Sequence, residues 1–461
     1  MKIIFLSNFL RVIGFNGIFC YNLRMSKEEK LGMEPYKGVR DFYPPDMFVQ
    51  NYIFDVMRKV VESYGYVEYS ASILEPGELY KAKTGEEIVN EQTYTFKDRA
   101  DREVTLRPEM TPTVARMVAR NRRELSLPAR WYSIPNLFRY ESPQRGRLRE
   151  HWQLNADIFG VKSLEAEREI IAISYDIMRE FGAKNEQFEI VINNRKIIQA
   201  LYDYFEFSAP ESYAVSKLID KKQKISNEEF TSKVRAIVGN KTDEFIKILN
   251  SKDINSLESA LPSELKENIG IQEIKNLLKE LGELGIKNAS FSPTLMRGFD
   301  YYTGIVFEVF DTGPKNNRSL FGGGRYDDLL DIFGSEKITA VGFGMGDVTI
   351  RDFLETYTLL PSYKPKTDLY ICRVDEKFNK EINALGERLR KNGLNVAIDL
   401  LDRKIGDQIK AADKQGIPYV ICVGDDEIKS GKYKVKNLKT SEEVTLEEKD
   451  IVKYIITKEL N

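Results

Sequence analysis

The sequence has little that would support metal, disulfide or nucleophilic chemistry. It contains one histidine, His151, and three cysteines at positions 20, 372 and 422. A single histidine cannot form a histidine metal pair, and no serine motif near it suggests a nucleophilic triad. The cysteines are odd in number and widely separated, which argues against a disulfide framework or a zinc knuckle. Cys372 and Cys422 lie in apolar runs, so we expect buried free thiols and a reducing, cytoplasmic compartment.

A charge excess and a long apolar run are also missing. Lys and Arg number 69 and Asp and Glu number 71, a net charge of −2, so contact with a nucleic acid must come from local clusters of charge. No run approaches the roughly 18 apolar residues of a membrane span. Hydrophobic residues make up 42% of the chain, which is enough to build cores. At roughly 150 residues per domain, the length predicts two or three domains.

The segment 1–24 is apolar, basic and free of acidic residues, and three interpretations of it stay open. Asn8, Arg11 and Asn16 interrupt any signal-peptide core, and no small-residue cleavage site follows. In the first interpretation, the translation start has been assigned too far upstream and the real one lies near Met25. In the other two, the segment is an organellar presequence or a secretory signal. We favour the first and expect residues 1–34 to lie outside the folded domains.

Hydrophobic periodicity predicts the main elements of the rest of the chain. An apolar stripe from Pro45 to Tyr64 predicts a long helix. Residues 65–76 alternate like one strand, residues 93–107 like a hairpin, and residues 130–141 and 148–160 like two strands joined by a basic loop. Between about 204 and 285, Lys, Glu, Leu and Ile recur at helical spacing, which predicts an inserted helical subdomain. After Pro361 and Pro365, strands and helices alternate, as in a separate α/β domain.

Arginine is concentrated in the segments predicted to be core strands and their loops, where lysine is scarce. These arginines are Arg107, Arg139, Arg145, Arg147, Arg149, Arg297 and Arg325. A guanidinium is always charged and its planar fork fits phosphate and carboxylate, so arginines fixed on strands suggest an anion cradle. Surface ion pairing is the alternative for any one of them.

The same segments carry groups that can bind a cationic amine and a polar side chain. They are Glu109, Glu141, Asp157 and Asp300, with Thr111, Gln153, Tyr301 and Tyr302. With the arginines, they predict a site for a zwitterion beside a polyphosphate. Core packing is an equally good interpretation of the tyrosine pair. The glycine triplet 322–324 is either a turn or a place where backbone approaches a ligand, and it does not match the P-loop pattern.

A series of motifs in this sequence resembles the histidyl-tRNA synthetases, which are class II aminoacyl-tRNA synthetases. In order, they are KGVRDF with the long helix and LEP, LRPEMTPTVARMVA, FRYESPQRGRLREHWQLNADIFG, LMRGFDYYTGIVFE, GGGRYDDLL and AVGFGMGD. The resemblance implies an α+β fold in which an antiparallel sheet flanked by helices spans 35–360. It also implies a helical insertion at about 204–288 and a C-terminal α/β anticodon-binding domain at 366–461.

The resemblance implies a histidine–tRNA ligase that works in two steps as a homodimer. The histidine carboxylate attacks the α-phosphate of ATP, which gives histidyl-adenylate and pyrophosphate, and histidine tRNA then takes the acyl group. Both partners in the first step are anionic, so catalysis should be mostly charge neutralisation and alignment, by arginines and by the Mg²⁺ that accompanies ATP.

The resemblance also implies roles for individual positions. Arg139 matches the residue that holds the α-phosphate, and Glu141 matches one at the adenine end. Arg297 matches the catalytic arginine that bridges the histidine carboxylate and the α-phosphate. Glu109, Thr111 and Gln153 match residues that grip the substrate's amino group, and Asp157 and Tyr302, with Tyr301 beside them, match those that bind the imidazole. Gln144, followed by Arg145 and Arg147 in the same loop, matches a position that helps read the 5′ guanosine of histidine tRNAs.

The sequence departs from the family pattern at two positions. Asp157 stands where bacterial members often have glutamate, so its reach is one methylene shorter. The last motif usually continues with an arginine that touches ATP, and this chain has Thr349 there. Arg351 lies about 200° further around the helix and is a poor replacement. We therefore expect Arg325 or the magnesium ions of ATP to compensate.

The missing arginine keeps other functions open. One alternative is a non-catalytic, histidine-sensing regulatory paralogue of ATP phosphoribosyltransferase. Against it stand Arg139, Arg297 and the C-terminal α/β domain, which those regulators lack. An amino-acid-binding module of a stress sensor is a third hypothesis, but no kinase-like segment flanks the motifs. For His151, the phosphate chemistry favours packing or tRNA contact over catalysis.

Overall fold

The computed structural model describes residues 3–6, 9–14, 17–21, 31–81, 92–222, 225–297, 301–313, 318–334 and 336–459. Asp300 therefore lies outside the described residues. The N-terminal unit, Met1–Asp41, contains an antiparallel sheet of β1 (Ile3–Leu6), β2 (Phe9–Gly14) and β3 (Gly17–Tyr21). The three hypotheses about residues 1–24 stay predictions.

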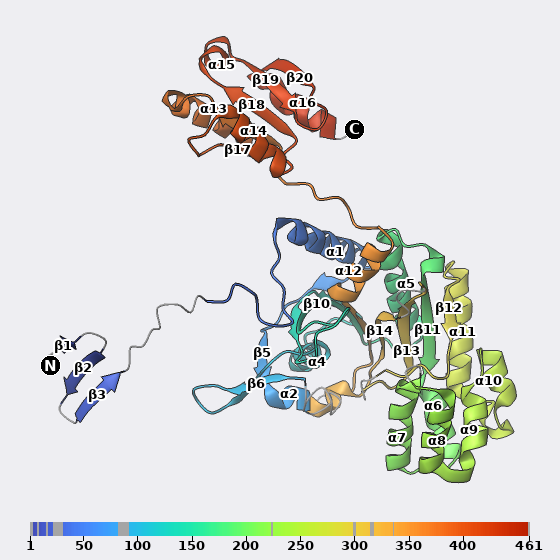
Figure 1. Cartoon of the computed structure of the whole chain (residues 1–461). Coiled ribbons are helices and arrows are strands. Elements are labelled where there is room, and N and C mark those ends of the chain that lie inside the picture. Colours follow the sequence, from blue (N-terminus) through green and yellow to red (C-terminus); the bar gives the residue numbers. More distant parts are fainter. Residues whose placement is uncertain are drawn as a thin grey trace. The chain divides into compact units, whose positions relative to one another are not determined.

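Residues 67–346 contain the strands of a nine-stranded, mostly antiparallel sheet (Figure 1). Its order is β12-β11-β13-β14-β15-β10-β8-β4, with β9 paired to β10. The strands are β4 (Val67–Glu68), β8 (Ala129–Ser133), β9 (Asn136–Phe138), β10 (Glu150–Phe159), β11 (Phe188–Asn194), β12 (Ala289–Phe291), β13 (Ile305–Asp311), β14 (Ser319–Arg325) and β15 (Ala340–Gly346). This sheet, with helices against it, confirms the predicted fold class.

The two faces of the sheet carry different side chains, because successive residues of a strand point to opposite faces. On β10, Leu154, Ala156 and Ile158 belong to the main apolar core, whereas Phe159 belongs to a smaller cluster. The main core also contains apolar residues of α1 (Pro44–Ser63), α5 (Glu165–Glu180), α6 (Arg195–Tyr204), α11 (Ile269–Glu283) and α12 (Asp347–Thr356). The smaller cluster includes α4 (Thr111–Arg120). On β10, the second face carries Gln153, Asn155 and Asp157 as well as Phe159 of the smaller cluster.

The long helix predicted from the apolar stripe is confirmed as α1. Two prolines begin it, which suits a first turn whose N–H groups have no partner within the helix. Ile53, Met57 and Val61, spaced four residues apart, are fully buried. The helix ends before Gly65, whose φ of 81° is favourable for glycine.

The prediction of one strand over residues 65–76 was wrong. β4 joins the large sheet, whereas β5 (Leu74–Pro76) joins a small sheet with β6 (Tyr94–Lys97) and β7 (Glu103–Leu106), the expected hairpin. Between β4 and β5, the chain is held by Arg107, whose Nη1 donates to the carbonyls of Ala71 (2.8 Å) and Ser72 (3.4 Å). The guanidinium of Arg107 fixes the change of chain direction between β4 and β5. The sequence patterns of residues 65–76 and 93–107 do not reveal this contact.

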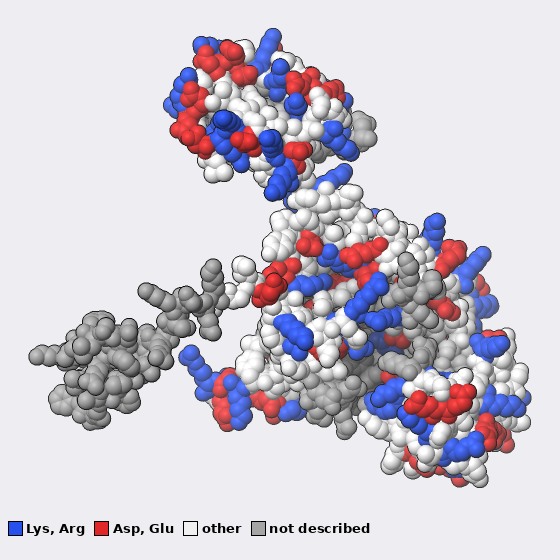
Figure 2. Space-filling model, in the orientation of Figure 1, with Lys and Arg blue, Asp and Glu red and all other residues white. Residues whose placement is uncertain are grey.

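Helices fill the segment where a helical insertion was predicted (Figure 1). They are α7 (Ala209–Asp220), α8 (Asn227–Val238), α9 (Thr242–Leu249) and α10 (Ile254–Ala260). The side chains of Ser226 and Asp253 accept bonds from backbone N–H groups at the starts of α8 and α10. Figure 2 shows basic and acidic side chains interspersed over the visible surface, in keeping with the balanced charge.

The last hundred residues form the predicted α/β arrangement, with a five-stranded sheet of order β17-β16-β18-β19-β20. Its elements are β16 (Leu369–Arg373), α13 (Asn379–Lys391), β17 (Val396–Ile398), α14 (Ile405–Lys414), β18 (Tyr419–Val423), α15 (Asp425–Ser430), β19 (Lys432–Asn437), β20 (Glu443–Glu447) and α16 (Glu448–Glu459). Cys372 pairs in register with Cys422 on the neighbouring strand, and both are free thiols. No helix among the described residues is long and apolar enough to cross a membrane.

Candidate active site

Four glycines on the two central strands leave part of the second face of the sheet without side chains. Gly322 of β14 pairs with Gly344 of β15, and Gly324 pairs with Gly342. We call these four residues the glycine floor. Neighbouring strands lie about 4.8 Å apart. Each row of the glycine floor is one pair of glycines from the two strands, and side chains of other elements can lie over it.

Functional side chains predicted from the sequence lie directly on this floor. A Cβ atom added to Gly322 would come within 2.1 Å of Nη1 of Arg297, and one on Gly344 within 2.4 Å of Nε2 of Gln153. A Cβ on Gly342 would come within 2.0 Å of Oδ1 of Asp157. Any side chain at these positions would displace one of the three, so the glycines let backbone approach functional groups.

Arg297 is largely buried, with 13% of its side chain exposed, and it is charged and not fully bonded. Its Nη1 lies 3.5 Å from Oε1 of Glu308, and its guanidinium carbon lies 5.8 Å from the centre of the Tyr302 ring. Burial alone would lower the pKa of Arg297, but Tyr302 and Glu308 outweigh it and the pKa is raised. Its Nε is buried and has no hydrogen-bond partner in the part of the chain that the structure describes. An anion above the floor would satisfy this donor.

Asp157 is buried beside the second row of the floor. The hydroxyl of Tyr326 donates a hydrogen bond of 2.5 Å to its Oδ1. Burial raises the pKa of Asp157 to about 7, and the bond from Tyr326 lowers it only in part. Sequence reasoning missed Tyr326. Its place in the GGGRYDD motif, next to an arginine already singled out, was the available signal.

Glu109, Thr111 and the tyrosine pair are linked to Asp157 through Tyr326. The hydroxyl of Tyr301 donates to Oε2 of Glu109 at 3.3 Å, and Thr111 also bonds to Tyr301. The Tyr301 ring lies 4.8 Å from that of Tyr302 and 5.8 Å from that of Tyr326. Both tyrosines of the pair are also part of the smaller apolar cluster, so they pack and line the site at once.

A pocket of about 180 Å³ adjoins the floor at Gly344. It is lined by Arg139, Glu141, Gly146, Arg147, Leu148, His151, Gln153, Leu320, Gly344, Gly346, Val348 and Thr349, and we call it the Arg139 pocket. Arg139 is held by a bond from its Nε to the carbonyl of Pro108 at 2.9 Å. Gly344 belongs to both the pocket and the glycine floor, and Gln153 lies over Gly344 and lines the pocket. Because Gly344 pairs with Gly322, which lies under Arg297, the Arg139 pocket and the surface under Arg297 adjoin.

The loop after Arg139 folds into a tight turn that is tied to α12. Gln144 and Arg147 exchange backbone hydrogen bonds of 3.0 and 2.9 Å around Gly146, whose φ is 76°. Nε of Arg145 donates to Asp352 at 2.7 Å. Arg147 lies 3.5 Å from Oε2 of Glu141. Both arginine side chains are more than half exposed, so a larger partner can still reach them.

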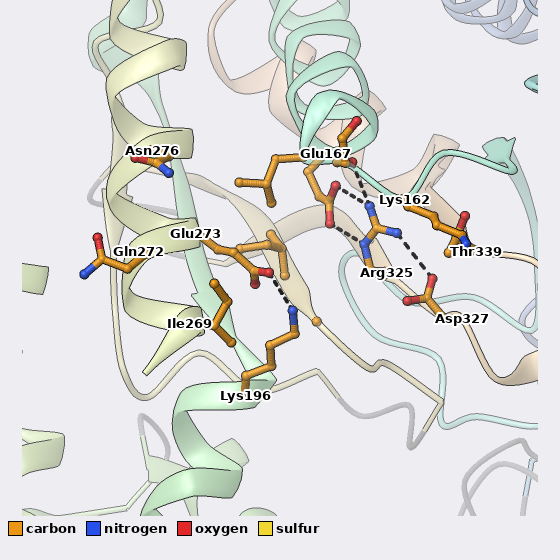
Figure 3. A pocket seen from close by; sticks show the side chains of 14 residues that line it. Lys162, Glu167, Lys196, Ile269, Gln272, Glu273, Asn276, Arg325, Asp327 and Thr339 are labelled. Carbon is orange, nitrogen blue, oxygen red and sulfur yellow. Dashed lines mark hydrogen bonds and ion pairs between the residues drawn. The ribbon is translucent and has the colours of Figure 1, made fainter. Parts of the chain in front are cut away.

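Arg325 does not line the Arg139 pocket. It bonds both oxygens of Glu167 (2.6 and 2.7 Å) and the carbonyls of Val161 and Ser163, and it lies 3.4 Å from Asp327. It lines a separate pocket of about 470 Å³ with Lys196 and Glu273 (Figure 3). Arg351 is also directed elsewhere, because it pairs with Asp46 and Glu355.

Metal-ligating groups do not gather in the described part of the chain. No group of three or more His, Cys, Asp or Glu side chains there could hold a metal ion. The site combines partly buried cations, a buried carboxyl of raised pKa and hydroxyls around an open sheet surface. Such an arrangement suits a small zwitterion and a phosphate anion that meet at Arg297 and Arg139.

Most of the chain is similar to known proteins. Residues 38–348 match the family model of histidyl-tRNA synthetase, and residues 368–458 match that of an anticodon binding domain. A histidine–tRNA ligase of Leptospira biflexa is 45% identical over 424 residues, which cover 91% of this chain and 96% of that protein.

Solved structures show the same fold. A histidyl-tRNA synthetase of a Nostoc species has a TM-score of 0.78 at 24% identity and covers 93% of this chain and 100% of its own. The apo histidyl-tRNA synthetase of S. aureus has a TM-score of 0.71 at 26% identity and covers 92% of this chain and 100% of its own.

Asp157 should make the stability of the protein depend on pH. A carboxyl whose folded pKa of about 7 exceeds its unfolded value contributes stability at low pH that is lost as the pH rises through about 7. Replacing Asp157 with Asn should remove this contribution, which is on the order of 4 kcal/mol. Urea unfolding between pH 4.5 and 8 should show the wild type losing stability relative to Asp157→Asn as the pH rises. Parallel curves would contradict the raised pKa.

Arg325 should be needed for stability. Arg325→Ala leaves the buried Glu167 carboxylate unpaired, which should reduce the free energy of unfolding by about 3–5 kcal/mol. Arg351→Ala is the matched control, since its partly exposed pairs contribute about 1 kcal/mol or less. Chemical denaturation measures both values. A small loss for Arg325→Ala, together with weaker ATP binding, would instead support the expected role of Arg325 with ATP.

Proposed function

We propose, since this chain belongs to the histidyl-tRNA synthetase family, that the Arg139 pocket holds ATP and that the glycine floor with Asp157 holds histidine. The protein is an aminoacyl-tRNA synthetase, which activates histidine with ATP and transfers it to histidine tRNA. The ligase relatives and the match to an anticodon binding domain favour this activity over a regulatory paralogue.

The observation that carries the site assignment is the state of Arg297. A largely buried guanidinium with an unsatisfied Nε lies over Gly322. Gly322 pairs with Gly344, and Gln153, which lies over Gly344, also lines the Arg139 pocket. The histidine carboxylate and the α-phosphate repel each other, and a cation between them lowers the energy of their approach. An oxygen of the carboxylate forms a bond to the α-phosphorus while the bond to pyrophosphate breaks. Arg139, on the pocket side, supports the same phosphate.

The choice of histidine follows from the groups around Asp157. The ionised carboxylate accepts the N–H of one imidazole nitrogen, and Tyr302 can bond the other. Tyr326 holds Asp157 in place. This buried site pairs with a side chain that has one hydrogen-bond donor and one acceptor. An amino acid without these groups would leave buried polar groups of the site unpaired, so the site discriminates strongly against it.

The substrate's amino group has its own ligands in this proposal. Nε2 of Gln153 donates to Oδ1 of Asn155 at 2.7 Å, which leaves Oε1 of Gln153 as an acceptor for an ammonium group. Glu109, bonded by Tyr301, supplies the negative charge. Thr111, at the first position of α4, adds a hydroxyl.

ATP enters the Arg139 pocket with its magnesium as part of the substrate, and Glu141 meets the adenine end. Gln144, Arg145 and Arg147 form an exposed turn that we assign to tRNA contact. The family-model matches at 38–348 and 368–458 support our division into a catalytic domain at 35–360, with its insertion at about 204–288, and an anticodon-binding domain at 366–461. The cytoplasm stays a prediction from cysteine usage.

We propose a homodimer from exposed apolar side chains near the start of α1 and on β4 and β5. Tyr43, Met47, Val67 and Leu74 are 38–69% exposed. Exposed apolar surface often marks an interface between protein chains. These four fit contact with a second copy of the chain.

Histidine-dependent exchange of pyrophosphate into ATP tests the activity and the role of Arg297 together. The wild type should catalyse exchange, and Arg297→Ala should lower kcat by about 10²- to 10³-fold, as when one transition-state donor is removed. Arg297→Lys should recover part of the rate. Arg388→Ala, on the C-terminal sheet domain, is the control. If the wild type showed no exchange, the regulatory paralogue would become the better assignment of function. An Arg297→Ala variant with full activity would refute the role of Arg297.

Gly344→Ala should reduce histidine binding through Gln153. The new methyl would meet only side-chain atoms of Gln153, so we expect the amide to be displaced with little loss of stability. The KM for histidine should rise by about tenfold, as for loss of one hydrogen bond to a charged group. Gln153→Ala should give a similar rise, and the double variant should add little more. Additive effects would show that Gly344 acts by another route.

A further inference from the structure

The two walls of the Arg139 pocket differ in charge. The wall formed by residues 139–153 carries Arg139, Glu141 and Arg147. The described lining residues of the opposite wall, on β14, β15 and α12, are Leu320, Gly344, Gly346, Val348 and Thr349, and none of them is charged. The hydroxyl of Thr349 is occupied, since it donates to the carbonyl of Leu320 at 2.8 Å. ATP in this pocket would meet a wall without a cation.

Arg318 comes directly before β14 and lies against the turn that contains the pocket-lining Gly146. Its Nη1 donates to the carbonyl of Arg145 at 2.7 Å. A Cβ atom on Gly146 would lie 3.9 Å from that nitrogen and 3.7 Å from Cγ2 of Thr349. Arg318 and Thr349 therefore both lie next to Gly146, which lines the pocket. Leu320, two residues after Arg318, also lines it.

We propose that Arg318 binds the outer phosphates of ATP and supplies the positive charge that α12 lacks at Thr349. This inference rests on the proposed function, which places ATP in the Arg139 pocket. The α-phosphate must lie at the inner end, beside Gln153 and Arg297, to meet the histidine carboxylate. The β- and γ-phosphates can then extend to the mouth, where Arg318 is exposed to solvent.

The geometry suits a fixed cation. A guanidinium has five N–H donors, and the bond to the carbonyl of Arg145 uses one of them and limits the positions of the group. The planar fork can then bind two phosphate oxygens. Neither Arg325 nor Arg351 can do this from the positions described above, because both are held by other carboxylates.

Calorimetric titration of ATP and of AMP, both with magnesium, separates the outer phosphates from the rest of the nucleotide. Arg318→Ala should raise the Kd for ATP by about tenfold or more, the effect of one charge-assisted bond, and leave the Kd for AMP unchanged. Arg318→Gln, which can still bond the carbonyl of Arg145, should behave similarly. Arg235→Ala, an exposed ion-paired arginine of α8, is the matched control.

A transplant of the charge tests the same idea independently. Thr349→Arg in the Arg318→Ala protein should return the Kd for ATP toward the wild-type value. An unchanged Kd for ATP in Arg318→Ala would overturn the proposal, and so would equal losses for ATP and AMP, which would indicate a disturbed loop. Failure of the proposed function is distinct, because the wild type itself would then show no histidine-dependent exchange.

Discussion

The site depends on the close approach of charged side chains to the backbone of β14 and β15. Glycine in a strand costs roughly 0.5–1 kcal/mol relative to alanine, so four of them on neighbouring strands are unfavourable for the sheet by themselves. The cost is offset because β14 and β15 lie in the interior of the sheet, paired on both sides. Phe321 and Phe343 also pack into the main core from the same two strands. The rigid sheet can therefore carry a bare surface.

The charges above the floor are arranged for ligands more than for the free protein. Arg297 has a carboxylate 3.5 Å away and an unsatisfied nitrogen, and Asp157 has a pKa raised to about 7 by burial. Such groups cost stability in an empty site. In the function that we propose, a carboxylate, a phosphate and an imidazole compensate them. Because the donors are already in place, little reorganisation is needed when negative charge builds up at the α-phosphate.

Much of the fold and part of the site could be predicted from the sequence. Apolar residues at helical spacing from Pro45 predicted α1. Alternating strand and helix patterns after Pro365 predicted the C-terminal α/β arrangement. The bend between β4 and β5 could not be predicted, because it depends on Arg107 reaching across from another segment. Tyr326 and Glu308 were missed for a similar reason. Their roles come from partners 169 and 11 residues away, and no local pattern encodes those contacts.

The arginines show most clearly what the sequence leaves open. The arginines named from the sequence all have the same charge and lie in similar aromatic or glycine-containing segments. In the structure, they differ in how many of their N–H donors are hydrogen-bonded. Arg325 and Arg107 each make four hydrogen bonds or more to oxygen atoms of the protein and have little capacity left for a ligand.

Arg297 keeps a buried nitrogen without a partner among the described residues, and Arg318 stands exposed beside a pocket wall that lacks charge. A buried donor without a partner costs about 1–3 kcal/mol, which a bound anion would offset. Among the arginines singled out from the sequence, tertiary contacts therefore determine which have donors left for the substrate that we propose.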